Sequence, residues 1–349
     1  MLGVIKMLKV KTKNSLYRFE VKWNYILWFH SYLKLFLVTK LLGKKISKYE
    51  IEFVIKIHNV GMFASFNWIL YVGLCCEKLQ IRNFSISYPD TVYGGSSSPN
   101  SNWIDGILIP RNSIRGAKYK IRINISNVRS FPEISRELRE LNLIKSNQIF
   151  QDLFEIEESI IQSVFEYVSQ EIASPFLAIH LRGTDKYKEA RLVTLSEVLE
   201  TLSSLIDRTQ NEVTPIFVAS DEKKLIEDLS LQIERQFPNC KVYFQKGFNR
   251  SLDGRPLHLR GYSSSGSEQD LAIEALIEAL ILSKSSILIR NSSFLSGWAS
   301  IFNPNLKVLM LNAPDKSKNW FPDSYISLNQ FPIDGFINLA TISKPKSGL

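Results

Sequence analysis

The chain has 349 residues, of which 45% are hydrophobic and 22% charged, and this composition excludes a disordered, collagenous or low-complexity protein. Its length suggests about two domains, each large enough to bury a core. Three cysteines, two of them adjacent, indicate no disulfide framework and no metal-binding pair, which favours a reducing compartment.

The net charge of +9 is concentrated at the start of the chain. Residues 1–60 hold 12 basic and 3 acidic side chains, whereas the rest of the chain carries 31 of each sign. A nucleic-acid enzyme is expected to spread positive charge along its working cleft. The neutral remainder therefore argues against nucleic acid as a partner.

Residues 1–50 are predicted to be an N-terminal extension rich in lysine and aromatic residues. Its apolar stretch begins late, follows many charges and lacks a small-residue cleavage site, which disfavours a signal peptide. Lys34 and Lys40 interrupt the most apolar window, which disfavours a membrane-spanning helix. One interpretation places residues 1–48 on an anionic membrane surface, which would make a cytoplasmic protein peripheral on the inner face of the membrane. The alternative is a helical extension packed on the body, with its lysines in solvent.

Residues 57–76 contain no Asp, Glu, Lys or Arg and are long enough to span a membrane. His58, Asn59 and Asn67 lie inside this stretch and disfavour a span. The pattern predicts instead a short strand over 51–58, a turn at 59–61 and a buried helix from about Phe63.

The middle of the chain predicts a short strand within 79–87 and then a polar surface loop from Tyr88 to Trp103, of a length more typical of functional loops than of connectors. The spacing of Leu, Ile and Phe further on predicts two helices, one over 132–144 and a long amphipathic one over 147–172 that would connect two domains.

From Pro175 onward, predicted strands alternate with helices, which indicates βαβ units and a parallel sheet. The strands are expected at 176–181, 215–220, 241–244, 286–291 and 307–312. The helices are expected at 194–209, 221–238, 267–284 and 294–302. Polar residues follow the strand ends, and ligands of parallel sheets bind at that edge.

The richest polar cluster is HLRGTDKYKEAR, from His180 to Arg191. Arg182 is a planar, permanent cation suited to phosphate oxygens, and Lys186 adds a second positive charge. Asp185 and Glu189 are carboxylates that could accept a proton from an acceptor hydroxyl. On these residues alone, the cluster predicts a site for a phosphorylated ligand, with a solvated charged turn as the alternative.

Two further clusters follow other strands. Asp221 follows PIFVAS, and Asn291-Ser292-Ser293 precedes the expected helix FLSGWASIF. Hydroxyl residues at such a position are typical of an anion site at a helix N-terminus, although a plain helix cap has the same appearance. The chain has no Walker loop, no GxGxxG, no HExxH and no DxD pair, so we expect no metal site.

In combination these segments resemble a known superfamily. HLRGTDK resembles the HxRxTDK-type motif of the fucosyltransferases that include α-1,6-fucosyltransferases, rhizobial nodulation fucosyltransferases and protein O-fucosyltransferases. VASDEKKLIEDL at 218–229 is similar to the second strand and helix of that superfamily, and the segment 276–308 is similar to its third motif, with a Ser-Ser turn. Residues 59–81 resemble the opening turn and helix of its first domain. The resemblance covers residues 51–312.

The resemblance implies an α/β GT-B fold, with two facing Rossmann-like domains at 51–165 and 166–320 and a tail at 321–349. It also implies an inverting, metal-independent glycosyltransferase that moves fucose from GDP-fucose to a glycan acceptor. Arg182 would neutralise the β-phosphate, and Lys186 would assist at the phosphate or acceptor side.

The remaining implied contacts are to the nucleotide. His180 would contact guanine or its ribose, and Glu278 stands where the family commonly has an aspartate that contacts guanine. Ser292 or Ser293 would bind the diphosphate, and Asp221 would line the pocket.

The chain departs from the core-fucosylating branch at two positions. That branch has a glutamate four residues after the motif lysine, where this chain has Ala190 next to Glu189, so Glu189 and Asp185 both stand as candidates for the base. Gly183 replaces a second arginine. A transferase with another nucleotide sugar and a non-catalytic nucleotide-sugar or glycan-binding protein are the alternatives.

Overall fold

A computed structural model describes most of the chain. The described residues are 49–56, 61–89, 102–111, 119–126, 141–172, 175–183, 191–206, 213–257, 268–312 and Asp323. The extension at 1–48, most of the loop from Tyr88 to Trp103, most of the expected helix at 132–144 and the tail apart from Asp323 lie outside the described residues, so the expectations for them stay predictions.

The first unit is built on a parallel sheet in which β1 (Tyr49–Lys56) lies between β2 (Phe84–Ser87) and β4 (Tyr119–Ser126). α3 (Met62–Lys78) connects β1 to β2 and is buried along most of its length. This confirms the strand and the buried helix expected from the sequence, whereas most of the turn expected at 59–61 lies outside the described residues. Within the described part of the chain, no helix combines the length and the apolar character that a membrane crossing needs.

The long helix predicted over 147–172 is wrong, because the structure divides that segment. α5 (Leu143–Leu153) ends where Phe154 takes an extended conformation, with φ −140° and ψ 148°. β5 (Phe154–Ile156) then pairs antiparallel with β3 (Leu108–Pro110) before α6 (Glu158–Glu166) and the π-helix η3 (Tyr167–Ile172). Strand pairing with a distant segment thus overrides local helical periodicity.

The second unit contains a five-stranded, fully parallel sheet in the order β10-β9-β6-β7-β8. In chain order the strands are β6 (Leu177–Leu181), β7 (Thr214–Ser220), β8 (Cys240–Tyr243), β9 (Ile287–Arg290) and β10 (Lys307–Met310). This is a doubly wound Rossmann-like order, and its topological switch point lies between β6 and β9. The strand–helix alternation predicted from the sequence is confirmed.

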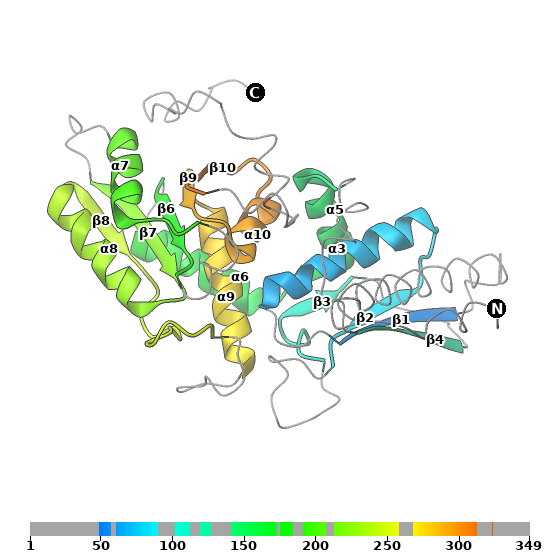
Figure 1. Ribbon diagram of the computed structural model, residues 1–349. Coiled ribbons are helices and arrows are strands. Elements are labelled where there is room, and N and C mark those ends of the chain that lie inside the picture. Colours follow the sequence, from blue (N-terminus) through cyan, green and yellow to red (C-terminus); the bar gives the residue numbers. More distant parts are fainter. Residues whose placement is uncertain are drawn as a thin grey trace, which may run out of the picture.

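Helices cover both faces of the second sheet (Figure 1). α7 (Leu195–Leu205) and α8 (Lys223–Gln236) cover the outer face and form one apolar cluster with it. α9 (Glu268–Ser283) and α10 (Phe294–Phe302) cover the other face, between the two sheets. The predicted fold class, α/β with two Rossmann-like units and parallel sheets as in GT-B proteins, is confirmed, whereas the domain boundaries stay predictions.

The two units share one continuous apolar core, and α10 packs against α3 and α5 at its centre. Trp298 on α10 is fully buried, and its Nε1 donates a hydrogen bond of 2.9 Å to Asn67 Oδ1 on α3. The Trp298 ring lies 5.3 Å from the ring of Phe66 and 5.6 Å from that of Phe150. Aromatic packing with one buried polar contact therefore joins the two units.

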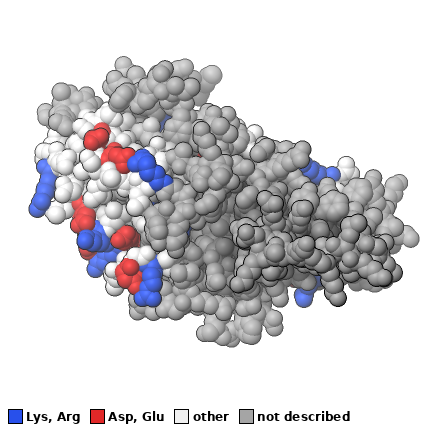
Figure 2. Space-filling view, in the orientation of Figure 1, with Lys and Arg blue, Asp and Glu red and all other residues white. Residues whose placement is uncertain are grey.

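On the surface of the second unit that Figure 2 shows, acidic and basic side chains alternate over the described atoms rather than gathering in a band of one sign. Examples are Lys223 with Glu227 on α8 and Arg191 with Glu197 at the start of α7. This agrees with the balance of 31 charges of each sign after residue 60.

The hydrogen bond between Trp298 and Asn67 gives a test of how the units are joined. Asn67→Ala removes the acceptor and leaves a buried indole N–H unpaired, so we expect the free energy of unfolding in urea to fall by about 1–3 kcal/mol. Asn305→Ala, at an exposed position, is the control and should change stability by less than about 0.5 kcal/mol. Equal stability of the two variants would contradict this role.

Candidate functional site

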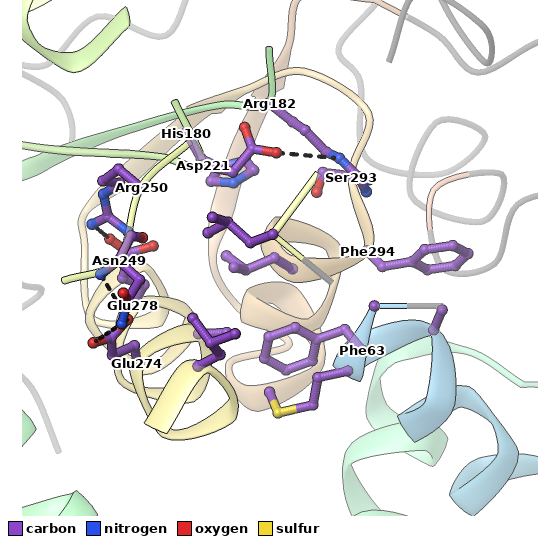
Figure 3. A pocket seen from close by; sticks show the side chains of 17 residues that line it. Phe63, His180, Arg182, Asp221, Asn249, Arg250, Glu274, Glu278, Ser293 and Phe294 are labelled. Carbon is purple, nitrogen blue, oxygen red and sulfur yellow. Dashed lines mark hydrogen bonds and ion pairs between the residues drawn. The ribbon is translucent and has the colours of Figure 1, made fainter. Parts of the chain in front are cut away.

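A cavity lies at the carboxyl ends of the strands of the second sheet, beside the switch point between β6 and β9. Its walls come from both units: the start of α3, the end of β6, the residues after β6 and β7, the loop after β8, α9 from Leu271 to Glu278 and the start of α10. Figure 3 shows this arrangement, with polar side chains on two sides and the Phe63 ring on a third.

The residues after β6 are held by an asparagine from β9. Asn291 Oδ1 accepts a hydrogen bond of 2.9 Å from the Arg182 backbone N–H, and Asn291 Nδ2 donates one of 2.9 Å to the Arg182 carbonyl. The Asn291 N–H also donates to the carbonyl of the buried His180, at 3.2 Å. The amide thus continues the pairing of the two strands past their ends and fixes the backbone that carries Arg182.

The side chain of Arg182 is oriented by Asp221, which follows β7. Arg182 Nε lies 3.7 Å from Asp221 Oδ2, and the Gly183 N–H donates to Asp221 Oδ1 at 3.2 Å. Both side chains stay partly accessible, at 18% and 24%, so the guanidinium can reach a ligand in the cavity. The structure therefore brings together three of the predicted residues, His180, Arg182 and Asp221.

Of the two adjacent serines, Ser293 lines the cavity and Ser292 does not. Ser293 is the residue before α10, and its side chain makes no capping hydrogen bond to that helix. Ser292 is turned away: its hydroxyl donates to Asp323 at 2.5 Å and its N–H donates to Asn312 at 2.7 Å. The N-terminus of α10, with its positive end of the helix dipole, consequently faces the cavity at Ser293 and Phe294.

Two carboxylates from α9 line the opposite side. Glu278 is buried and forms an ion pair with Arg250, while Glu274 accepts hydrogen bonds from Asn249 N at 2.9 Å and from Asn249 Nδ2 at 3.0 Å. Burial raises the pKa of Glu278 above the range of an ordinary glutamate, and the nearby Arg250 opposes this increase. Glu278 was predicted from the sequence to lie in the site, and it does line the cavity.

Asn249, Arg250 and Glu274 were not predicted. Asn249 and Arg250 belong to the segment after β8, where Ser251 N–H donates to the Asp221 carbonyl at 2.7 Å and its own carbonyl accepts from Lys223 N–H at 3.1 Å. These contacts attach the segment to the residues after β7. The available signal was the polar pair Asn249-Arg250 in the loop that follows β8, since polar residues after other strands of a parallel sheet also predict a ligand site.

The start of α3 completes the cavity from the first unit, through Gly61, Met62, Phe63 and Ala64. Figure 3 shows the Phe63 ring turned towards the cavity and the Phe294 ring turned away from it. Asp185, Lys186 and Glu189 lie outside the described residues, so their positions stay predictions. In the described part of the chain, no three His, Cys, Asp or Glu side chains gather as ligands of a metal ion would.

Comparisons with known proteins give similarities of fold only. No family model matches the chain, and no curated protein matches it. Among solved structures, fucosyltransferase NodZ from Bradyrhizobium is 12% identical, with 74% of this chain and 95% of NodZ covered and a TM-score of 0.46. FUT1 of Arabidopsis thaliana in complex with GDP is 14% identical, with 84% and 80% covered and a TM-score of 0.41.

A third similar structure is POFUT1 in complex with GDP, which is 10% identical, with 74% of this chain and 98% of POFUT1 covered and a TM-score of 0.38. At TM-scores below 0.5, these structures do not decide the function of this chain. The function proposed below therefore rests on the geometry of the cavity.

Breaking the ion pair between Arg250 and Glu278 should lower the stability of the protein by an amount that depends on pH. Burial already raises the pKa of Glu278 above its unfolded value, and Arg250→Met removes the cation that opposes this increase, so the pKa should rise further. The unfolded value is about 4.3. Stability then falls as the pH rises above that value. We expect a small deficit relative to wild type near about pH 4, growing by about 2 kcal/mol or more at about pH 8.

Urea unfolding at several pH values measures this difference. Arg235→Met, at an exposed position on α8, is the matched control and should show no pH-dependent deficit. A deficit of Arg250→Met that is the same at every pH would show that Glu278 does not depend on this cation.

Proposed function

We propose that this chain is an inverting, metal-independent glycosyltransferase that transfers a sugar from a nucleoside diphosphate sugar, GDP-fucose, to a glycan acceptor. The observation that carries the proposal is the polarity of the cavity. One end holds Arg182 and the N-terminus of α10, and the other holds two carboxylates beside Arg250. This division matches a donor with an anionic diphosphate and a base rich in N–H groups.

The diphosphate belongs at the end formed by Arg182 and Ser293. A guanidinium binds phosphate oxygens in a bidentate manner, and a helix N-terminus supplies N–H groups and a positive potential. Both groups are already positioned, Arg182 by Asp221 and Asn291, and α10 by its packing against α3. Preorganised donors of this kind can stabilise the charge that develops on a leaving diphosphate, which supports transfer without a metal.

The guanine base of the nucleotide belongs at the end formed by Glu278 and Arg250. Guanine presents N1–H and N2–H side by side, and an ionised carboxylate, which only accepts hydrogen bonds, can accept both. A guanidinium is the preferred partner of the acceptors O6 and N7 of guanine. Uracil and adenine lack this combination of adjacent donors and acceptors, so the pair favours GDP. His180 is buried and lines the cavity, and we assign it a contact with guanine or its ribose.

The apolar side formed by the start of α3, with Met62, Phe63 and Ala64, supports a 6-deoxy sugar. The methyl group of fucose can lie against such a wall, whereas the hydroxyl of an ordinary hexose would lose hydrogen bonds there. Because α3 belongs to the first unit, we assign the acceptor to that side of the cavity. Glu189 and Asp185 are the two candidates for the catalytic general base, the carboxylate that takes the proton of the acceptor hydroxyl.

Nucleotide binding and turnover test this function together. In calorimetric titrations, GDP should bind at least about tenfold more tightly than UDP, ADP or CDP. Arg182→Ala should lower turnover by about 10²–10³-fold in a folded protein, and Arg182→Lys should also be poor because an ammonium cannot replace the bidentate fork. Equal binding of all four nucleotides would contradict GDP as the donor nucleotide, and GDP binding without transfer to any acceptor would indicate a binding protein.

Metal dependence gives a separate test. With Arg182 and α10 in place of a cation, activity in excess EDTA should remain close to activity in Mg²⁺ or Mn²⁺. Loss of activity in EDTA that Mn²⁺ restores would contradict the metal-independent mechanism. Arg182→Ala should show the same lowered turnover in both conditions, because the cation that it lacks is a side chain and not a metal.

A further inference from the structure

A buried ion pair lies behind the turn that carries Ser293. Arg290 is the last residue of β9, lies in register with His180 on β6, and is fully buried. Its Nη2 pairs with Oδ1 of Asp323, a residue beyond β10 whose side chain is only 4% exposed. The side chains of this ion pair do not line the cavity, and neither does Ser292.

Asp323 also holds the turn directly. Its Oδ2 accepts the hydroxyl hydrogen of Ser292 at 2.5 Å, while Arg290 Nε donates to the Asn291 carbonyl at 3.4 Å. The carboxylate thus connects the end of β9 to the middle of the turn. One residue further on, Ser293 and the N-terminus of α10 face the cavity.

We propose that Asp323 is a positioning residue for the diphosphate end of the cavity. By holding Arg290 and Ser292 on the buried side of the turn, it directs Ser293 and the N-terminus of α10 towards the ligand. The inference rests on the proposed function, because it needs a diphosphate at that end. It makes a residue from the C-terminal segment part of the donor site, although no motif of the sequence includes it.

A purely structural role is the competing explanation, and the energetics of buried pairs separate the two. Replacing a buried ion pair by apolar residues of similar size is often neutral or stabilising, so stability alone gives little reason for an arginine and an aspartate here. The double variant Arg290→Met with Asp323→Leu should therefore fold. It removes the acceptor for Ser292 as well, and only a positioning role predicts a selective loss of affinity for ligands that carry phosphate.

The experiment compares GDP with guanosine, which lacks the diphosphate, by calorimetric titration of the full chain. Three proteins are compared with wild type: Ser292→Ala, the double variant, and the control Ser285→Ala. Ser285 is also a buried serine, and its hydroxyl donates to the Leu282 carbonyl at 2.8 Å, at the opposite end of β9. Urea unfolding establishes that each variant is folded.

We expect the ratio of GDP affinity to guanosine affinity to fall about tenfold in Ser292→Ala and in the double variant, with guanosine affinity unchanged, and to stay at the wild-type value in Ser285→Ala. A wild-type ratio in the folded double variant, or equal weakening of both ligands, would overturn the inference while leaving the proposed function intact. A wild-type protein that binds GDP no better than guanosine would overturn the proposed function, and this inference with it.

Discussion

The packing of α10 against α3 is the contact on which the candidate site depends. Both helices begin at the cavity, α3 at Met62 and α10 at Phe294, and both are joined one turn deeper by Trp298 and Asn67. Because the indole is fully buried and hydrogen-bonded, neither helix can shift without losing both aromatic packing and a buried polar contact. One contact in the shared core thereby sets how the wall from the first unit faces the wall from the second.

The polar side chains of the cavity are held by buried or half-buried partners, and each partner orients a group rather than merely adding stability. Asp221 and Asn291 orient Arg182, and Arg250 keeps a counter-charge beside Glu278. Buried ion pairs are weak contributors to stability, which makes a cluster of them around one cavity informative about function. The resulting polarity, positive at the α10 end and negative at the α9 end, is what a nucleoside diphosphate sugar needs.

Much of the fold could be predicted from the sequence because local signals agree with the tertiary structure. Helix 294–302 is found with the predicted bounds, and the five strands of the second sheet lie where apolar runs alternate with amphipathic helices. Polar residues after separate strands, such as Arg182 and Asp221, could be assigned to one site because parallel strands end at the same edge. The interruption at Phe154 could not be predicted, since its partner strand at Leu108–Pro110 lies far away in the sequence.

The details of the site that could not be predicted from the sequence depend on contacts between residues far apart along the chain. Ser292 and Ser293 are adjacent and chemically identical, but Ser292 contacts the distant Asp323 and Asn312, whereas Ser293 lines the cavity. Arg250 belongs to no motif, and its importance follows from its contact with Glu278, which lies 28 positions further along. Such pairings are properties of the folded chain and leave no periodic pattern behind.

The most direct test of the central claim, that the cavity binds a nucleotide with its diphosphate at the α10 end, is a crystal structure of the protein with GDP. We expect the guanine edge to face Glu278 and Arg250, and the phosphate oxygens to lie within hydrogen-bond distance of the Arg182 guanidinium and the first N–H groups of α10. A GDP molecule bound in the reverse orientation, or bound away from the β6–β9 switch point, would contradict it.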